Sequence, residues 1–189
     1  MKNRQSKLAK VLSLVVMGTL TFVVLSSPAL AQKAQELKDA HKMMADGWKM
    51  YNDGQRMVIK GQEMNDLVAQ QMGFKSDMDP GDKYIQDGRK TITQAATLFG
   101  QGEKTFMDNM NTPSVAKQGL KMMSDAFKMA DDGSKMIEKG MTMNIKVAEA
   151  KGAIEKFAQG NQVINDGRAT MAQGAQLFMK GEAIYLKNK

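Results

Sequence analysis

Residues 44–64 read MADGWKMYNDGQRMVIKGQEM, and two residue types recur in this stretch at intervals of seven. The glycines are Gly47, Gly54 and Gly61, and the methionines are Met50, Met57 and Met64. Seven residues make almost two turns of an α-helix, so residues seven apart share one face. The stretch therefore predicts a long helix that carries a row of glycines and, beside it, a row of methionines.

The same pattern returns 79 residues later along the chain. Leu37–Met110 aligns with Ala116–Lys189, and 30 of the 74 aligned pairs are identical. Met43, Met50, Met57 and Met64 correspond to Met122, Met129, Met136 and Met143. We therefore expect two tandem helical hairpins, over residues 32–110 and 113–189, that together form one domain.

The first 31 residues have the composition of a secretory signal peptide. Lys2, Arg4, Lys7 and Lys10 precede an apolar run, and small residues follow it up to Ala31. The run is short for a membrane span, so we expect cleavage after Ala31 rather than an uncleaved anchor. The mature chain is then expected in the periplasm or outside the cell, with no membrane insertion of its helices, because charged residues recur along them.

Composition narrows the classes of function. Four of the 27 basic residues and none of the 20 acidic ones lie in residues 1–31, which leaves a net charge of +3 for the rest. Basic and acidic residues alternate there, which argues against a nucleic-acid partner. The chain has no cysteine, which excludes disulfides, haem attachment motifs and iron–sulfur ligation.

Helix signals divide the chain into four segments, at about 33–72, 80–110, 113–150 and 154–187. Pro80 and Pro113 suit the first turn of a helix, and Gly73 and Gly152 suit a helix end. Asp-Gly pairs would also fit a β-solenoid, but strand alternation is absent and helix-forming residues dominate. We predict an all-α, antiparallel four-helix bundle with coiled-coil heptads. An elongated pair that completes its core by oligomerising is the alternative.

With glycine at heptad position a, apolar residues fall at a, d and e of each helix, which predicts the core-facing stripe. The glycines expected to form a helix-packing seam are Gly47, Gly54, Gly61, Gly88, Gly102, Gly133, Gly140, Gly160, Gly167, Gly174 and Gly181. Each glycine costs about 1 kcal/mol of helix stability relative to alanine. Close approach of two helix backbones would offset this cost, and a groove filled by a ligand or a partner helix is the alternative.

Seventeen of the 19 methionines lie after residue 31. Methionine is a flexible filler of irregular space, which is the structural interpretation. Thioethers also bind soft ions such as Cu(I), and they can be oxidised sacrificially. Residues seven apart on one helix are about 10.5 Å apart, so a copper site would need sulfurs from different helices. The candidate ligands are Met43, Met50, Met57, Met64, Met122, Met129, Met136 and Met143.

Few other side chains suggest chemistry. His41 is the only histidine, and we expect it on the surface. Trp48 is expected to be partly exposed. Aspartates at position g should pair with basic residues of neighbouring helices. They are Asp46, Asp53, Asp87, Asp132 and Asp166.

No nucleophile–base pair, zinc ligand set or di-iron motif is visible in the sequence. We therefore expect a non-enzymatic exported protein with no cofactor, which acts through a protein partner or through self-association. Soft-metal binding by methionines of different helices is the alternative.

Overall fold

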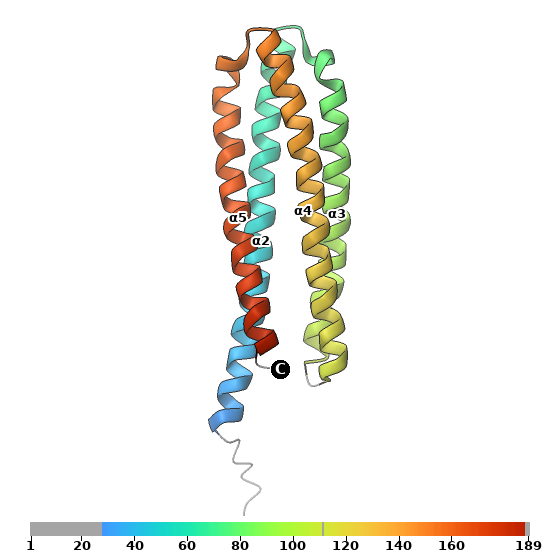
Figure 1. Ribbon diagram of the computed structural model, residues 1–189, viewed down its shortest axis with the longest axis vertical. Helices are drawn as coiled ribbons and strands as arrows, with labels where there is room; N and C mark the ends of the chain where they lie inside the picture. Colours follow the sequence, from blue (N-terminus) through green and yellow to red (C-terminus); the bar gives the residue numbers. More distant parts are fainter. Residues whose placement is uncertain (1–27, 111, 188–189) are drawn as a thin grey trace, which may run out of the picture. The chain divides into compact units, whose positions relative to one another are not determined.

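A computed structural model describes residues 28–110 and 112–187 of the chain. Four α-helices and two short 3-10 turns make up this part: α2 (Pro28–Gln71), η1 (Lys75–Met78), α3 (Asp79–Asp108), α4 (Pro113–Ala150), η2 (Ile154–Phe157) and α5 (Ala158–Lys187) (Figure 1). The chain divides into two compact units, residues 1–35 and 36–189, and the packing described below is that of the second unit. Of the predicted signal peptide, residues 1–27 lie outside the described part.

The prediction of an all-α protein with four helices is confirmed. The first helix begins at Pro28, earlier than the expected start at 33. The turn between α4 and α5, which lacks a proline, closes in the same way as the turn after α2. Gly73 and Gly152 have φ angles of 78° and 65°. Glycine adopts this left-handed conformation without strain, and it ends both helices.

The turns are further fixed by backbone hydrogen bonds that span six residues. The Phe74 N–H donates to the Ala69 carbonyl at 3.0 Å, and the Ala153 N–H donates to the Ala148 carbonyl at 2.8 Å. These bonds satisfy carbonyls that the helix end would leave unpaired. Both hairpins therefore reverse direction with the same geometry.

The helices form two close pairs. Glycines of α2 lie against the backbone of α5, and glycines of α3 lie against the backbone of α4. Figure 1 shows α2 beside α5 and α4 beside α3. Each close pair therefore takes one helix from each of the two sequence repeats, a partnership that the repeat itself does not reveal.

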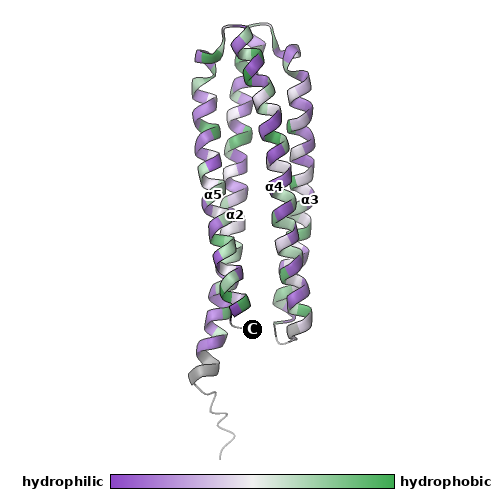
Figure 2. Ribbon diagram, in the orientation of Figure 1, coloured by the Kyte–Doolittle hydropathy of each residue, from purple (hydrophilic) through white to green (hydrophobic). Residues whose placement is uncertain are grey.

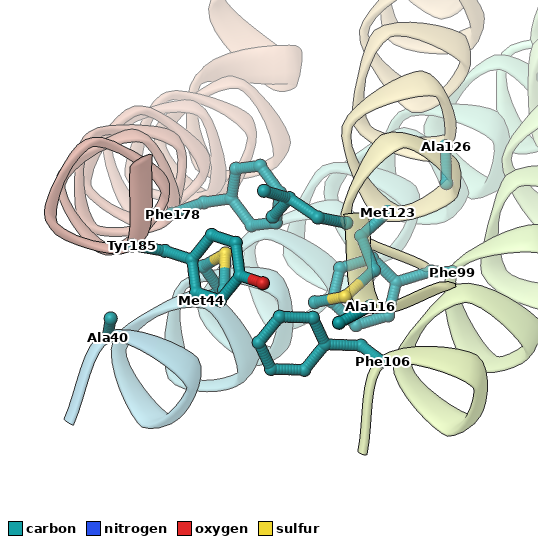
Figure 3. Close-up of a cluster of buried hydrophobic side chains, with 10 residues drawn as sticks. Ala40, Met44, Phe99, Phe106, Ala116, Met123, Ala126, Phe178 and Tyr185 are labelled. Carbon is teal, nitrogen blue, oxygen red and sulfur yellow. The ribbon is translucent and has the colours of Figure 1, made fainter. Parts of the chain in front are cut away.

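The hydrophobic core lies between the two close pairs. Its largest cluster combines residues of all four helices, including Met44, Phe99, Met123 and Phe178, all at most 2 % exposed. Figure 3 shows these side chains converging with Phe106 and Tyr185. Hydrophobic and hydrophilic residues are interspersed along every helix (Figure 2), as expected for helices with one buried side.

The buried stripe differs from the expected a/d/e pattern. In a helix, position e lies about 40° to one side of position a, and position d about 60° to the other side. Position e is buried in every helix, for example at Tyr51, Ile92, Ile137 and Phe178. The residues at d that lie beside the glycine rows are only half-buried. The second close pair therefore covers the e side of each glycine row, and position d forms the outer edge.

Candidate functional site

The glycine seams are the two rows of contact between α2 and α5 and between α3 and α4. Facing residues in each row have numbers that add up to 221, because the helices are antiparallel. The facing pairs between α2 and α5 are Gly47 with Gly174, Gly54 with Gly167, Gly61 with Gly160, and Ala40 with Gly181. Those between α3 and α4 are Gly81 with Gly140, Gly88 with Gly133, and Gly102 with Gly119.

The seams leave no room for a side chain. A Cβ atom added to Gly167 would lie 2.5 Å from the Gly54 carbonyl oxygen and 2.8 Å from the Val58 nitrogen. These are backbone atoms, which cannot move away as a flexible side chain can. The structure places all eleven glycines of the expected seam against a neighbouring helix. Gly81 and Gly119 also belong to the seam and were missing from the expected set, although Gly81 lies seven residues before Gly88 and Gly119 fourteen before Gly133.

The methionines at position d lie along the outer edge of the seams. In each close pair they alternate with the d residues of the partner helix, and we call these two half-buried rows the outer stripes. One stripe consists of Met43, Met50, Met57, Met64, Val163, Thr170, Leu177 and Ile184. The other consists of Met122, Met129, Met136, Met143, Tyr84, Thr91, Leu98 and Thr105.

Two matched contacts show how each stripe is built. The Thr170 hydroxyl lies 4.0 Å from the Met57 sulfur, and the Thr91 hydroxyl lies 4.0 Å from the Met136 sulfur. Met57 thus packs in the pair α2 and α5, and Met136 packs in the pair α3 and α4. Because the e side of each seam faces the core, the two stripes lie on opposite outer faces of the bundle. The thioethers of α2 and α4 therefore belong to separate surfaces.

An aromatic cluster fills the core near the middle of the helices. Trp48 stacks on Phe99 with ring centroids 4.3 Å apart, and Tyr51 meets the edge of Phe127 at 4.8 Å. Phe127 also stacks on Phe178 at 4.6 Å. Trp48 is half-buried, in agreement with the expectation of partial exposure.

A polar layer crosses the core next to these rings. The Gln55 amide donates a hydrogen bond to the Ser134 hydroxyl at 2.8 Å, and the Tyr51 hydroxyl lies 2.8 Å from the same oxygen. Burial raises the pKa of Tyr51 to about 12, although the hydrogen bond with Ser134 opposes the shift. Gln55 and Ser134 are equivalent residues of the two repeats, so the layer lies on the axis that relates them.

A second polar cluster, here called the turn-end cluster, lies between α2, η1 and α3. Lys75 forms ion pairs with Asp66, at 3.7 Å, and with Asp82. Gln62 donates to Asp66 at 2.8 Å, and Asn144 of α4 donates to Asp82 at 2.8 Å. A cavity of about 160 Å³ lies beside these residues. In the other repeat, the positions equivalent to residues 62, 66 and 75 hold Met141, Ile145 and Ile154, so only one repeat has the charged cluster.

The environment of this cluster shifts two pKa values. Burial and the nearby Asp82 carboxylate raise the pKa of Asp66, and Lys75 opposes this shift. Burial lowers the pKa of Lys75, but its hydrogen bond to Asp82 and the charge of Asp66 outweigh burial and raise it overall. The folded protein therefore favours a protonated Asp66 more than the unfolded chain does.

Asp66→Asn is expected to stabilise the protein at neutral pH, because asparagine resembles the protonated acid. A raised pKa in the folded state gives stability that is present below the unfolded value, about 4, and is lost as the pH rises through the folded value. The gain in melting temperature should therefore be positive at pH 7 and shrink towards pH 4. Thermal melts followed by circular dichroism measure it.

Asp46→Asn is the matched control, since Asp46 forms an exposed ion pair with Lys42 in its own helix. Its effect should stay within about 0.5 kcal/mol at both pH values. A loss of stability in Asp66→Asn at pH 7 would show that the ion pair with Lys75 outweighs the desolvation of Asp66.

His41 does not lie on the open surface, contrary to the expectation. Its side chain is 17 % exposed, and Nε2 lies 3.3 Å from the Glu103 carboxylate. Its ring stacks on Phe106 at 5.6 Å. Position b of α2 faces the core side of the seam, which explains the burial.

The expected pairing of aspartates across helices is wrong for four of the five. Each of the four pairs with a basic residue three or four positions away in its own helix: Asp46 with Lys42, Asp53 with Arg56, Asp87 with Lys90, and Asp132 with Lys135. Asp166 accepts a hydrogen bond from Gln162, also in its own helix. Position g points away from the neighbouring helix, so a partner on the same helix is closer.

The described residues contain no cluster of three or more His, Asp or Glu side chains arranged to hold a metal ion. Within residues 28–110 and 112–187, no helix combines the length and apolar character needed to cross a bilayer. No protein family, curated protein or solved structure matches this chain. The site must therefore be interpreted from its own geometry.

Proposed function

We propose that the protein is exported and non-enzymatic, and that it acts by binding another protein through its outer stripes. Its two tandem hairpins pack along glycine seams that are edged by methionines. The observation that carries the proposal is the pair of methionine rows on opposite faces. All eight methionines are half-buried, so each keeps part of its apolar surface in contact with water. Flexible thioethers adapt to differently shaped partners, and they are frequent at protein-binding surfaces.

The shape of the stripes supports a helical partner. Each stripe follows two antiparallel helices and repeats a methionine every seven positions on α2 or α4, and the contacts Met57 with Thr170 and Met136 with Thr91 join that row to the partner helix. An amphipathic helix presents anchors at similar intervals, so it can lie along such a row. The glycine seams hold the two backbones of each stripe at a fixed, short separation, which keeps the row straight.

Site-specific photo-crosslinking in cells that export the protein tests this proposal. A photoreactive residue at position 50 or 129 should give discrete adducts, because both positions lie in an outer stripe. The same residue at position 179 is the control, since Met179 is 56 % exposed but lies outside both stripes. Adducts of equal yield at all three positions, or none at any, would contradict the proposal. An adduct of twice the chain mass would identify self-association.

Binding of a soft metal ion such as Cu(I) is the alternative proposal. The thioethers are partly exposed, but those of α2 and α4 lie on separate outer stripes, and residues seven apart on one helix are about 10.5 Å apart, so the geometry favours the protein-binding proposal. The reduced mature protein is titrated with Cu(I) against a competing chelator. If the stripes bind copper, Met50→Leu with Met129→Leu should remove the binding. Met72→Leu with Met179→Leu, which changes two exposed methionines outside the stripes, should preserve it. Failure to compete with the chelator would exclude this alternative.

A further inference from the structure

The glycine-seam contacts of the described residues all join one half of the chain to the other. We call Leu37–Met110 half 1 and Ala116–Lys189 half 2. Half 1 supplies α2 and α3, and half 2 supplies α4 and α5. Since the glycine seams pair α2 with α5 and α3 with α4, neither half contains a seam of its own.

The interface between the halves is self-complementary. Each seam step has a counterpart displaced by one repeat, so that Gly54 with Gly167 corresponds to Gly133 with Gly88. Gln55 and Ser134 occupy equivalent positions and contact each other at 2.8 Å, which is the sign of a two-fold axis. The arrangement is that of an isologous dimer whose two protomers are joined into one chain.

The seams would accept any combination of halves. Two copies of half 1 would place Gly54 against Gly88 and Gly61 against Gly81. Two copies of half 2 would place Gly133 against Gly167 and Gly140 against Gly160. Alanine is tolerated at single steps, as Ala40 opposite Gly181 shows. The glycine rows therefore do not distinguish a half of the same chain from a half of another.

The core layer next to the two-fold axis, by contrast, favours pairing of half 1 with half 2 over pairing of two identical halves. Tyr51 and Ala130 are equivalent residues and belong to one buried cluster. Pairing half 1 with half 1 would bring two tyrosines into the space that now holds one, and pairing half 2 with half 2 would leave a cavity. Both outcomes are destabilising, so the core favours a half 1 with a half 2.

The connection between the halves, residues 109–112, contains no glycine, unlike the other two turns. Among the described residues between α3 and α4, the Asn109 N–H donates to the Phe106 carbonyl at 3.3 Å, and the Thr112 N–H donates to the Asn109 carbonyl at 2.8 Å. By contrast, the turns after α2 and α4 are closed by glycines with positive φ and by six-residue hydrogen bonds.

From these contacts we propose that a second copy of this chain is a partner for the half-to-half interface. In the resulting dimer, half 1 of each molecule packs on half 2 of the other, and every seam contact of the single molecule is kept. Tyr51 and Ala130 restrict the exchange to unlike halves. This inference is independent of the outer stripes and of what they bind.

Engineered cysteines in the full mature chain test the exchange, since the natural chain has no cysteine. In Gln55→Cys with Ser134→Cys, a chain that pairs with itself forms an internal disulfide, and an exchanged dimer forms disulfides between chains. The protein is refolded at increasing concentration under oxidising conditions and run on a non-reducing gel. We expect the share of covalent dimer to rise with protein concentration.

Thr112→Ala with Pro113→Ala should shift the balance further to the dimer, because without the proline α3 and α4 can continue as one helix. Gln55→Cys alone is the control and should give no covalent dimer, because its single thiol then faces Ser134. A covalent fraction that stays at zero at every concentration with the natural link would overturn the proposal, whether or not the link variant folds. Equal crosslinking by Gln55→Cys alone would overturn the preference for unlike halves.

Discussion

Gly167→Ala is expected to destabilise the protein, whereas Gly100→Ala is expected to stabilise it. Both changes improve helix propensity by about 1 kcal/mol. The new methyl group at 167 would lie 2.5 Å from the Gly54 carbonyl oxygen, so the two helices must separate. Overpacking of this kind costs about 1–3 kcal/mol or more, because the neighbouring atoms belong to a backbone.

Gly100 is the matched control, since it is also a glycine inside a helix but has nothing within 4 Å of an added Cβ. Urea unfolding followed by circular dichroism measures both free energies of unfolding. Opposite signs for the two variants are the expected result. If both variants were stabilised, the backbones of α2 and α5 would not be in close contact at this step.

Phe99→Ala is expected to have the largest effect of the single substitutions considered. Phe99 is 2 % exposed and stacks on Trp48 at 4.3 Å, with Phe178 at 6.0 Å on another side. Removing a buried phenylalanine costs about 3–5 kcal/mol, a large part of the 5–15 kcal/mol that stabilises a typical domain. The midpoint of chemical unfolding should fall accordingly.

Fluorescence gives a local readout of the same change, because Trp48 is the only tryptophan. Loss of the stacked ring should expose the indole to water and shift its emission to longer wavelength. Met179→Ala is the control, since Met179 is 56 % exposed, and its effect should stay within about 0.5 kcal/mol with unchanged emission. An unchanged spectrum in Phe99→Ala would contradict the stacking.

The recurrence of glycine every seven residues allows much of this fold to be predicted from the sequence. Gly47, Gly54 and Gly61 recur at the helical period, and Gly73 marks the end of the helix that carries them. Periodicity reports the angular position of each residue around its own helix axis. Helix number, helix length and the reversal at Gly73 follow from such local information.

The arrangement of helices around one another does not follow from it. Positions d and e flank the glycine row at similar angles, about 60° and 40°, so periodicity alone cannot decide which of the two faces the core. The position of the second close pair decides it, and this is why the methionines of position d form an outer edge. Contacts such as His41 with Phe106, or Asn144 with Asp82, join residues far apart in sequence and leave no periodic signal.

Each glycine seam joins a helix of one half to a helix of the other, and this affects how the protein unfolds. A hairpin that kept its own tight contacts could survive after the other had melted, but here α2 relies on α5 and α3 relies on α4. When either half unfolds, each helix of the other half loses the helix it packs against most closely. States in which only one half is folded are therefore unstable. Residues 36–189 should therefore behave as one cooperative unit, with equal calorimetric and van't Hoff enthalpies in a single heat-absorption peak.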